Sequence, residues 1–317
     1  MNKLFLMRNK EVFQGEKYLE KDKEYFEGWY FKNTSQSKTI SFIPGISIHK
    51  KKKKTFIQVL MNHKSYFFYY DISEFKYSHN PFFIKIGNNY FSKEKIHINI
   101  YDKKKKIFLQ GDLNYSNSIS IRKSLIQPNI MGPFSYISFM ECNHAILCMK
   151  NEVNGSIKIN KKEIIFNQGT GYIEKDWGTS FPKSYIWMQG NQFKKKDASF
   201  MLSIANIPFK VFSFKGVICV LIIDGKEYRF TTYNHCKIIK YKISNEMIQI
   251  ILKQKDYTLI IQSFYEIGKR LLAPVKGKME KDVLESVSAE VSVTLKEKED
   301  ILFMDTSTNC GLELVKK

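Results

Sequence analysis

This sequence contains few arginines, and its cysteines show no recognisable spacing. Its five cysteines are Cys142, Cys148, Cys219, Cys236 and Cys310. They form no Cys-x-x-Cys pair and show no metal-ligand spacing, and their number is odd, so free thiols in a reducing compartment are expected. The formal net charge of +20 comes mainly from lysine, and the arginine forks that suit phosphate or guanine are scarce. The sequence therefore argues against nucleic acid as a partner.

The lysines gather in short runs instead of forming one basic surface. Residues 50–54, 103–106 and 194–196 are such runs, and each lies between two strand-like segments. A charge run at the tip of a hairpin is usually just solvated. The charge is still compatible with weak association with an anionic membrane surface, which a hydrophobic substrate would favour.

Long apolar runs are also missing. The longest one, residues 217–223, is far shorter than the ~18 residues that a membrane-spanning helix needs. The N-terminal residues 1–13 contain too short an apolar run for a signal peptide. The sequence therefore predicts a soluble, cytoplasmic protein.

Motifs that hold cofactors or metals are absent as well. The sequence has no glycine-rich dinucleotide fingerprint between a strand and a helix, no phosphate loop, no Gly-x-Ser-x-Gly elbow and no His-Glu-x-x-His. The six histidines are dispersed singly, so no three-histidine metal site can be recognised from local spacing. We expect chemistry that uses no cofactor and no metal, or no chemistry at all.

What the chain does contain is a long series of strand signals. Hydrophobic residues make up 43% and aromatic residues 15%, which is typical of β-rich globular proteins. Residues 96–101 alternate isoleucine with polar side chains, and Asp224-Gly225 is a strong signal for a type I′ hairpin. The pattern predicts roughly sixteen short strands. One short helix is expected at residues 279–288, from the helical spacing of Val283, Leu284 and Val287.

These signals predict an all-β protein with two antiparallel β-barrel or sandwich domains. A chain of 317 residues is long enough for two domains. We place the joint near residues 177–182, with one domain at 1–178 and the other at 179–317. No low-complexity linker separates them, so we expect an interface there, where pockets often form.

The most informative stretch of the sequence is residues 169–193, GTGYIEKDWGTSFPKSYIWMQGNQF. In a strand, Tyr172, Glu174 and Asp176 share one face, whereas Lys175 and Trp177 lie on the other. Two carboxyl groups on one buried face cannot both ionise cheaply, so one should keep its proton and could donate it. Asp176 and Glu174 are therefore the candidate catalytic residues. Gly171 and Gly178 bracket them and permit bends or close backbone approach.

Three further segments supply candidate binding residues. In the next strand, Tyr185, Trp187, Gln189 and Asn191 share an aromatic and amide face. Near the N-terminus, Glu27 and Trp29 share one face and Tyr30 lies on the other. His144 interrupts the apolar segment 134–149, where a lone histidine is more often a hydrogen-bonded structural residue than a catalyst. The simplest alternative for the whole region is a solvated acidic turn with structural tryptophans.

Three stretches together resemble the tocopherol cyclase family. They are YFEGWYFK at 25–32, GPFSYISFMECNHAI at 132–146 and GYIEKDWGTSFPKSYIWMQGNQF at 171–193. The resemblance implies a lipocalin-like double β-barrel, related to carotenoid hydratase-type proteins. It also implies a prenylated hydroquinone as substrate and a chromanol as product.

The resemblance gives the candidate residues roles. Asp176 or Glu174 would protonate a trisubstituted alkene, and the phenol oxygen would close on the resulting cation. Aromatic faces stabilise such a cation by ~1–2 kcal/mol when desolvated. The residues expected to bind substrate are Glu27, Trp29, Tyr30, His144, Tyr172, Trp177, Tyr185, Trp187, Gln189 and Asn191.

The alternative is a non-catalytic lipocalin-like carrier of a hydrophobic ligand. Both functions predict an apolar cavity at the domain joint with Glu174 and Asp176 at its end. In a carrier, both acids would be bound in structural salt bridges. The enzymatic interpretation requires that the two acids are shielded from bulk solvent and face an apolar cavity lined by Trp29 or Trp187.

Overall fold

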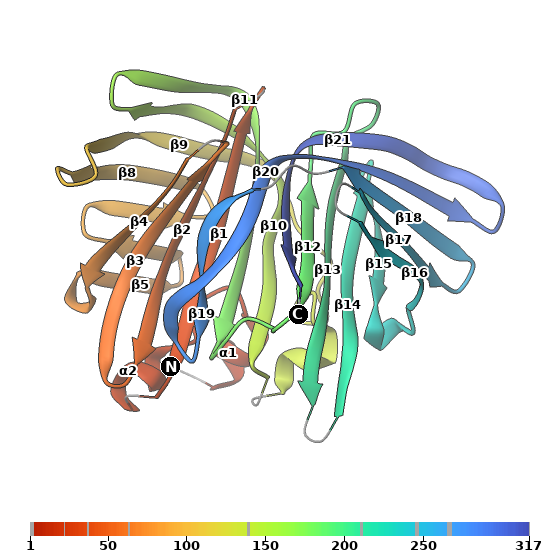
Figure 1. Ribbon diagram of the computed structural model, residues 1–317, viewed down its shortest axis with the longest axis horizontal. Coiled ribbons are helices and arrows are strands. Elements are labelled where there is room, and N and C mark those ends of the chain that lie inside the picture. Colours follow the sequence, from red (N-terminus) through yellow and green to blue (C-terminus); the bar gives the residue numbers. More distant parts are fainter. Residues whose placement is uncertain are drawn as a thin grey trace. The chain divides into compact units, whose positions relative to one another are not determined.

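Antiparallel strands dominate the computed structural model, which confirms the all-β class (Figure 1). The structure describes residues 3–21, 23–36, 38–62, 64–137, 140–209, 212–244, 247–264 and 268–316. By their contacts, residues 1–181 and 272–282 form one compact unit, and residues 182–271 and 283–317 form a second. All five cysteines are free thiols, as expected.

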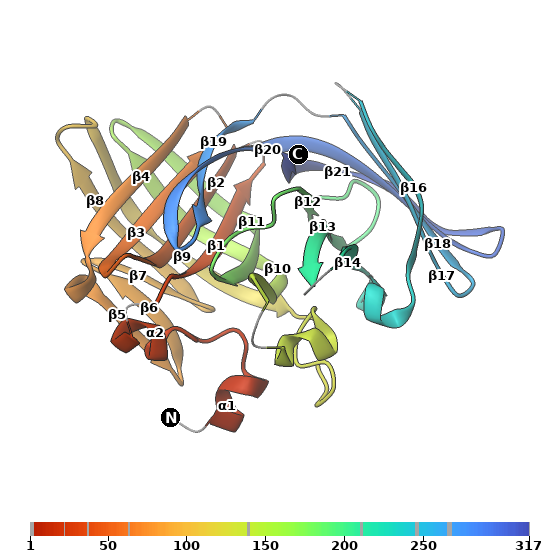
Figure 2. The same cartoon turned by 60° about the horizontal axis from the view of Figure 1, so that its bottom comes forward.

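The first unit is built on one curved eleven-stranded sheet in the order β4-β3-β2-β1-β11-β10-β9-β8-β7-β6-β5 (Figure 2). Its strands are β1 (Tyr25–Ser35), β2 (Lys38–His49), β3 (Lys52–Met61), β4 (Lys64–Asp71), β5 (Phe75–His79), β6 (Phe82–Ile86), β7 (Asn89–Ser92), β8 (Lys95–Asp102), β9 (Ile107–Ile119), β10 (Cys142–Ile159) and β11 (Lys162–Gly178). Its short helices and 3₁₀ turns are α1 (Lys3–Arg8), α2 (Glu16–Lys21), η1 (Ile72–Glu74) and η2 (Gly132–Tyr136). The order places β11 in the middle of the sheet, between β1 and β10.

The second unit has a ten-stranded sheet with the order β15-β14-β13-β12-β21-β20-β18-β17-β16, and β19 pairs with β20. Its elements are β12 (Tyr185–Gly190), β13 (Ala198–Phe209), β14 (Phe212–Ile223), β15 (Lys226–Thr231), η3 (Thr232–Asn234), β16 (Lys237–Ile243), β17 (Met247–Gln254), β18 (Tyr257–Phe264), β19 (Lys269–Val275), β20 (Lys278–Glu297) and β21 (Asp300–Val315). Parts of β19 and β20 belong to the first unit, where Gln58 exchanges two hydrogen bonds of 2.9 Å with the backbone of Leu272.

Each unit has its own apolar core, because one face of each strand carries the larger apolar side chains. Ile96, Ile98 and Ile100 are buried in the first core, and the polar residues between them face outward, as their alternation predicted. The expected hairpin at Asp224-Gly225 is also present, since both residues have positive φ angles, 47° and 79°.

The helix expected at residues 279–288 is wrong, because this segment is part of the long strand β20. Met279, Val283 and Val287 are spaced by four residues, and that spacing keeps side chains on one face of a strand as well as of a helix. The exposure of Leu284 distinguishes a strand from a helix in this segment. A helix would bury it beside Val283, whereas here it is 47% exposed.

The described part of the chain contains no helix that is long and apolar enough to cross a membrane.

Candidate functional site

The register of three neighbouring strands brings acidic and basic side chains together. In β11, Asp176 lies opposite Gly28 of β1 and opposite His144 of β10. Glu174, two residues earlier, lies opposite Tyr30 of β1. Laterally paired residues project from the same face of a sheet, so the two acids, His144 and Tyr30 share one face.

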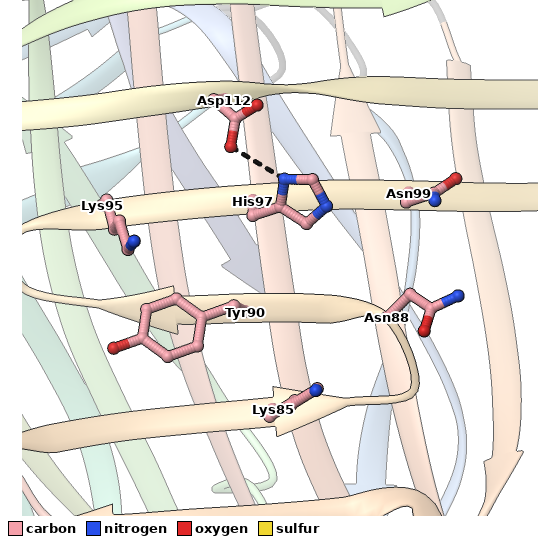
Figure 3. Close-up of a pocket in the computed structure, with 7 residues that line it drawn as sticks. All are labelled: Lys85, Asn88, Tyr90, Lys95, His97, Asn99 and Asp112. Atoms are coloured by element: carbon pink, nitrogen blue, oxygen red, sulfur yellow. Dashed lines mark hydrogen bonds and ion pairs between the residues drawn. The ribbon is translucent and has the colours of Figure 1, made fainter.

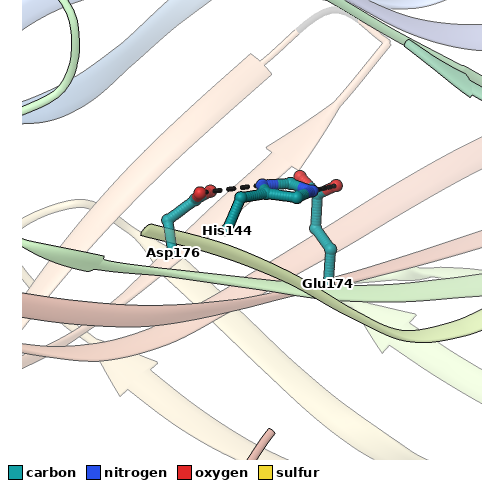
Figure 4. Close-up of side chains that lie close together, drawn as sticks. All are labelled: His144, Glu174 and Asp176. Carbon is teal, nitrogen blue, oxygen red and sulfur yellow. Dashed lines mark hydrogen bonds and ion pairs between the residues drawn. The ribbon is translucent and has the colours of Figure 1, made fainter. Parts of the chain in front are cut away.

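His144 bridges the two carboxyl groups (Figure 4). Its Nδ1 lies 2.8 Å from Oδ1 of Asp176, and its Nε2 lies 3.3 Å from Oε2 of Glu174. The hydroxyl of Tyr172 donates a hydrogen bond of 2.6 Å to the same Glu174 oxygen. We call His144, Glu174 and Asp176 the acid–histidine cluster. Sequence reasoning found all of its members but did not predict that His144 would join the two acids.

Solvent access differs along the cluster. The side chain of Glu174 is 6% exposed, that of His144 is 11% exposed and that of Asp176 is 23% exposed. The acids are therefore largely shielded from bulk solvent, and Asp176 is the most accessible of the three residues.

The charges in the cluster keep His144 protonated. Burial alone would lower the pKa of this imidazole, but the charges of Asp176 and Glu174 outweigh burial and raise its pKa to about 10. Burial, followed by the charge of Glu174, also holds the pKa of Tyr172 well above its usual value, so the phenol remains a hydrogen-bond donor. At neutral pH the site is thus an imidazolium between the carboxyl groups of Glu174 and Asp176.

The same three residues are also a possible set of metal ligands. One ligand atom from each lies within 4.8 Å of the others, a grouping that local sequence spacing did not predict. A divalent ion would need a neutral imidazole nitrogen, whereas both nitrogens of His144 face carboxylate oxygens and the pKa of the ring is raised to about 10. A divalent ion held by these three residues would therefore have to displace the proton of His144.

The opposite face of β11 carries a second charged group. The Lys175 ammonium lies 2.5 Å from Oε1 of Glu27, and both side chains are fully buried. The rings of Trp29 and Trp177 flank the same ammonium, at 5.2 and 4.4 Å from their centroids. Glu27, Trp29 and Trp177 were expected to bind substrate beside the acids, but the structure places them on the other side of the sheet, in the first core. These two tryptophans stabilise a lysine of the protein itself.

The remaining expected residues belong to the second unit. Tyr185, Trp187 and Gln189 are buried in β12, and Asn191 follows that strand. The Tyr185 hydroxyl donates a hydrogen bond of 2.6 Å to Glu313 of β21.

Sequence reasoning missed two acids in this region. Glu313 lies opposite Trp187 on one side and opposite Glu285 of β20 on the other, and both acids are buried. Neither is close in sequence to β12, and Glu285 lies in the segment that was expected to be helical. No local pattern could have indicated this pairing.

A hollow of about 570 Å³ lies on the outer face of strands β6 to β9 (Figure 3). It is lined by Lys85, Asn88, Tyr90, Lys95, His97, Asn99 and Asp112. His97 and Asp112 form a hydrogen-bonded pair at 2.8 Å on this exposed surface. None of these residues belongs to the acid–histidine cluster, so this hollow is not the cavity that the sequence predicted beside Glu174 and Asp176.

Comparison with known proteins identifies one matching family. The family model described as tocopherol cyclase-like matches residues 118–315, which is more than half of the chain. No curated protein sequence gives a significant match.

Several solved structures share the fold. The crystal structure of CghA with Sch210972 has a TM-score of 0.58 at 9% identity, and covers 92% of this chain and 89% of its own. A putative AttH from Nitrosomonas europaea has a TM-score of 0.53 at 13% identity, with coverages of 93% and 94%. Kievitone hydratase from Nectria haematococca has a TM-score of 0.51 at 9% identity, with coverages of 92% and 89%. At such low identities these similarities concern the fold alone.

Proposed function

Since this chain belongs to the tocopherol cyclase-like family, we propose that it is an enzyme that cyclises an unsaturated, hydrophobic substrate by acid catalysis without a cofactor. The observation that carries the proposal is the acid–histidine cluster, in which His144 joins Glu174 and Asp176 on one largely buried face. Shielded acid–base groups with short mutual contacts are what proton transfer to a weakly basic carbon requires.

The proposed reaction begins with a proton. In the proposed step, the carboxyl group of Asp176 gives its proton to one carbon of a trisubstituted alkene, and His144, at 2.8 Å, pairs with the carboxylate that remains. A tertiary cation forms at the other alkene carbon. The carboxylate of Glu174 and the cluster's remaining negative charge stabilise this cation electrostatically.

Ring closure then completes an isomerisation. A phenol oxygen of the substrate forms a bond to the cationic carbon, and the phenol proton returns to the cluster. Holding the phenol next to the alkene removes several kcal/mol of the barrier. Tyr30 and Tyr172, which lie on the face of the cluster, are proposed to orient the substrate.

A prenylated hydroquinone is the proposed substrate class, because the family description refers to tocopherol cyclase. The first step is the same in a hydratase, where water takes the place of the phenol oxygen. One solved structure with this fold is named a hydratase. A hydrated product should therefore be sought as well as a cyclised one.

The test is incubation of the purified protein with a panel of prenylated hydroquinones, followed by chromatography and mass spectrometry. A cyclised product has the mass of the substrate and a new retention time, whereas hydration adds one water. In deuterated water, the product should carry one carbon-bound deuterium, because the cluster supplies the proton.

Two variants identify the role of the cluster. Asp176→Asn should lower turnover by about 10²- to 10⁴-fold and retain ligand binding, because the amide cannot donate a proton of comparable acidity. Asp112→Asn is the matched control, since Asp112 contacts His97 at the same 2.8 Å on the exposed surface. A protein that binds the ligands tightly but converts none of them would be a carrier, and the proposed enzyme function would be wrong.

A further inference from the structure

Residues 9–16, which we call the N-terminal plug, fill space inside the curved sheet of the first unit. Figure 2 shows this segment between α1 and α2, at one end of the sheet. Phe13 is fully buried in the first core. Its ring lies 5.2 Å from that of Phe75 and 4.5 Å from that of Tyr77. Small β-barrels can hold a ligand in this interior, whereas here the chain itself occupies it.

The buried pair of Glu27 and Lys175 holds the plug by its backbone. Lys175 donates from Nζ to the carbonyl oxygens of Lys10 and Val12, at 3.0 and 2.6 Å. Glu27 accepts from the backbone N–H of Gln14, at 2.9 and 3.1 Å to its two oxygens. With Glu27 as its third partner, the ammonium group uses all three of its donors.

Other strands bind the plug as well. The indole N–H of Trp29 donates to the carbonyl of Glu11 at 3.0 Å, and a ring nitrogen of His79 lies 3.0 Å from the carbonyl oxygen of Phe13. The carboxylate of Glu11 forms ion pairs with Lys93 and Lys123. The plug is therefore attached to several distant segments of the first unit.

Lys175 lies in β11 directly between Glu174 and Asp176. Successive side chains of a strand project to opposite faces, so any contact that keeps Lys175 on the inner face keeps both acids on the other. We propose that the N-terminal plug, through Glu27 and Lys175, positions the acid–histidine cluster, and that Glu27 and Lys175 are positioning residues. This inference rests on the proposed function of the cluster, but its test does not need turnover.

The protonation of the pair agrees with this geometry. Burial lowers the pKa of Lys175 to about 8, although the charge of Glu27 raises it, and burial raises the pKa of Glu27 although Lys175 lowers it. Each residue therefore depends on the other to stay charged in the core, and removal of either one should loosen the plug at Lys10, Val12 and Gln14.

The experiment compares full-length Lys175→Met and Glu27→Gln with the wild-type protein. Hydrogen–deuterium exchange is followed in peptides that cover residues 9–16 and 172–178, and the titration of the His144 imidazole is followed by NMR. In both variants, exchange in both peptides should become at least about tenfold faster. The midpoint of the His144 titration should shift by about one pH unit or more, because its carboxylate partners move. Lys95→Met, which removes an exposed lysine of β8, is the control and should change none of these values.

Faster exchange in residues 9–16 alone, with residues 172–178 and His144 unchanged, would make the plug a stabilising element only and overturn its positioning role. Unchanged exchange in all peptides would overturn the proposal too, because the pair would not hold the plug. If Lys175→Met does not fold, Glu27→Gln decides the matter, because glutamine keeps the shape of glutamate but removes the negative charge that pairs with the Lys175 ammonium. An inactive wild-type protein would contradict the proposed reaction and leave these readouts unaffected.

Discussion

His144 is the residue on which the chemistry of the site depends. An imidazole usually titrates near pH 6.5, but here two carboxyl groups, one at each ring nitrogen, raise its pKa to about 10 in spite of burial. A histidine in an apolar strand is more often structural, and sequence reasoning could not determine what it contacts. The partners come from the pairing of β10 with β11, which brings residues 144 and 176 opposite each other.

The raised pKa makes the contribution of His144 to stability depend on pH. Below about pH 6.5, His144 is protonated in the folded and the unfolded protein, and its stabilising contribution is complete. As pH rises toward 10, the unfolded chain loses this proton before the folded protein does, so the contribution falls. The difference in free energy of unfolding between wild type and His144→Gln should shrink by up to about 3 kcal/mol from pH 6 to pH 9. Urea denaturation across this range measures it, and a difference that is constant or grows with pH would contradict the proposed charge state.

Tyr172 supports the cluster from the same strand. Tyr172→Phe keeps the ring but removes the hydroxyl that donates to Glu174 at 2.6 Å. A buried acceptor that loses its donor costs about 1–3 kcal/mol, and urea denaturation should show a loss of this size. Tyr101→Phe, at a position that is 72% exposed, should lose little stability. Equal losses in both variants would contradict the role assigned to Tyr172.

At the scale of elements, β11 is held tightly between its neighbours. Gly178, which ends the strand two residues after Asp176, has a φ angle of 152°, and an added Cβ would lie 2.1 Å from the carbonyl oxygen of Glu141. The position of this Cβ is blocked by the backbone of Glu141, which cannot move aside as a flexible side chain could. The close approach agrees with the sequence-based expectation for this glycine.

Gly178→Ala should therefore destabilise the protein by more than about 2 kcal/mol, because positive-φ strain adds to the overlap with Glu141. Gly225→Ala is a matched control, since Gly225 has a φ angle of 79° but an added Cβ would have no neighbour within 4 Å. Gly225→Ala should lower the free energy of unfolding by only about 1 kcal/mol, the cost of placing alanine at a positive φ angle. Thermal or urea denaturation compares the two, and a smaller loss at Gly178 than at Gly225 would contradict the close approach.

The strand β20 allows a sharp test of the helix that was expected there. Val283 is 2% exposed and its neighbour Leu284 is 47% exposed, as in a strand with one buried face. Val283→Lys should unfold the protein or lower its stability by more than about 3 kcal/mol, and Leu284→Lys should change it by less than about 0.5 kcal/mol. Circular dichroism and urea denaturation provide the measurement. Comparable losses at the two positions would favour the helix.

At the scale of the whole molecule, the charge of +20 is the most general property. Part of the positive charge lies in short lysine runs, such as residues 103–106 in the turn between β8 and β9. We expect the protein to bind vesicles with anionic lipid at low ionic strength and to be released by about 0.5 M salt, because surface charges are screened at that concentration. Vesicle sedimentation tests this, with zwitterionic vesicles as the control. Binding that is equal for both lipids, or independent of salt, would show that charge is not the cause.

Patterns among neighbouring residues were sufficient to predict the local features of the chain. The period of two places Glu174 and Asp176 on one face and Lys175 on the other, and turn chemistry places the hairpin at Asp224-Gly225. The spacing of Met279, Val283 and Val287 fits a strand as well as a helix, so local pattern alone led to an error there.

Tertiary structure decided what depends on pairing between distant segments. The register of β10 against β11 gives the two acids a shared histidine, and the folding back of residues 9–16 places the chain itself inside the first sheet. Such pairings depend on which segments meet and in which register, and an alternation within one strand is compatible with many partners. Which residues share a face of one strand is therefore local information, whereas the residues that meet on a face of the sheet are decided only by which strands pair and in which register.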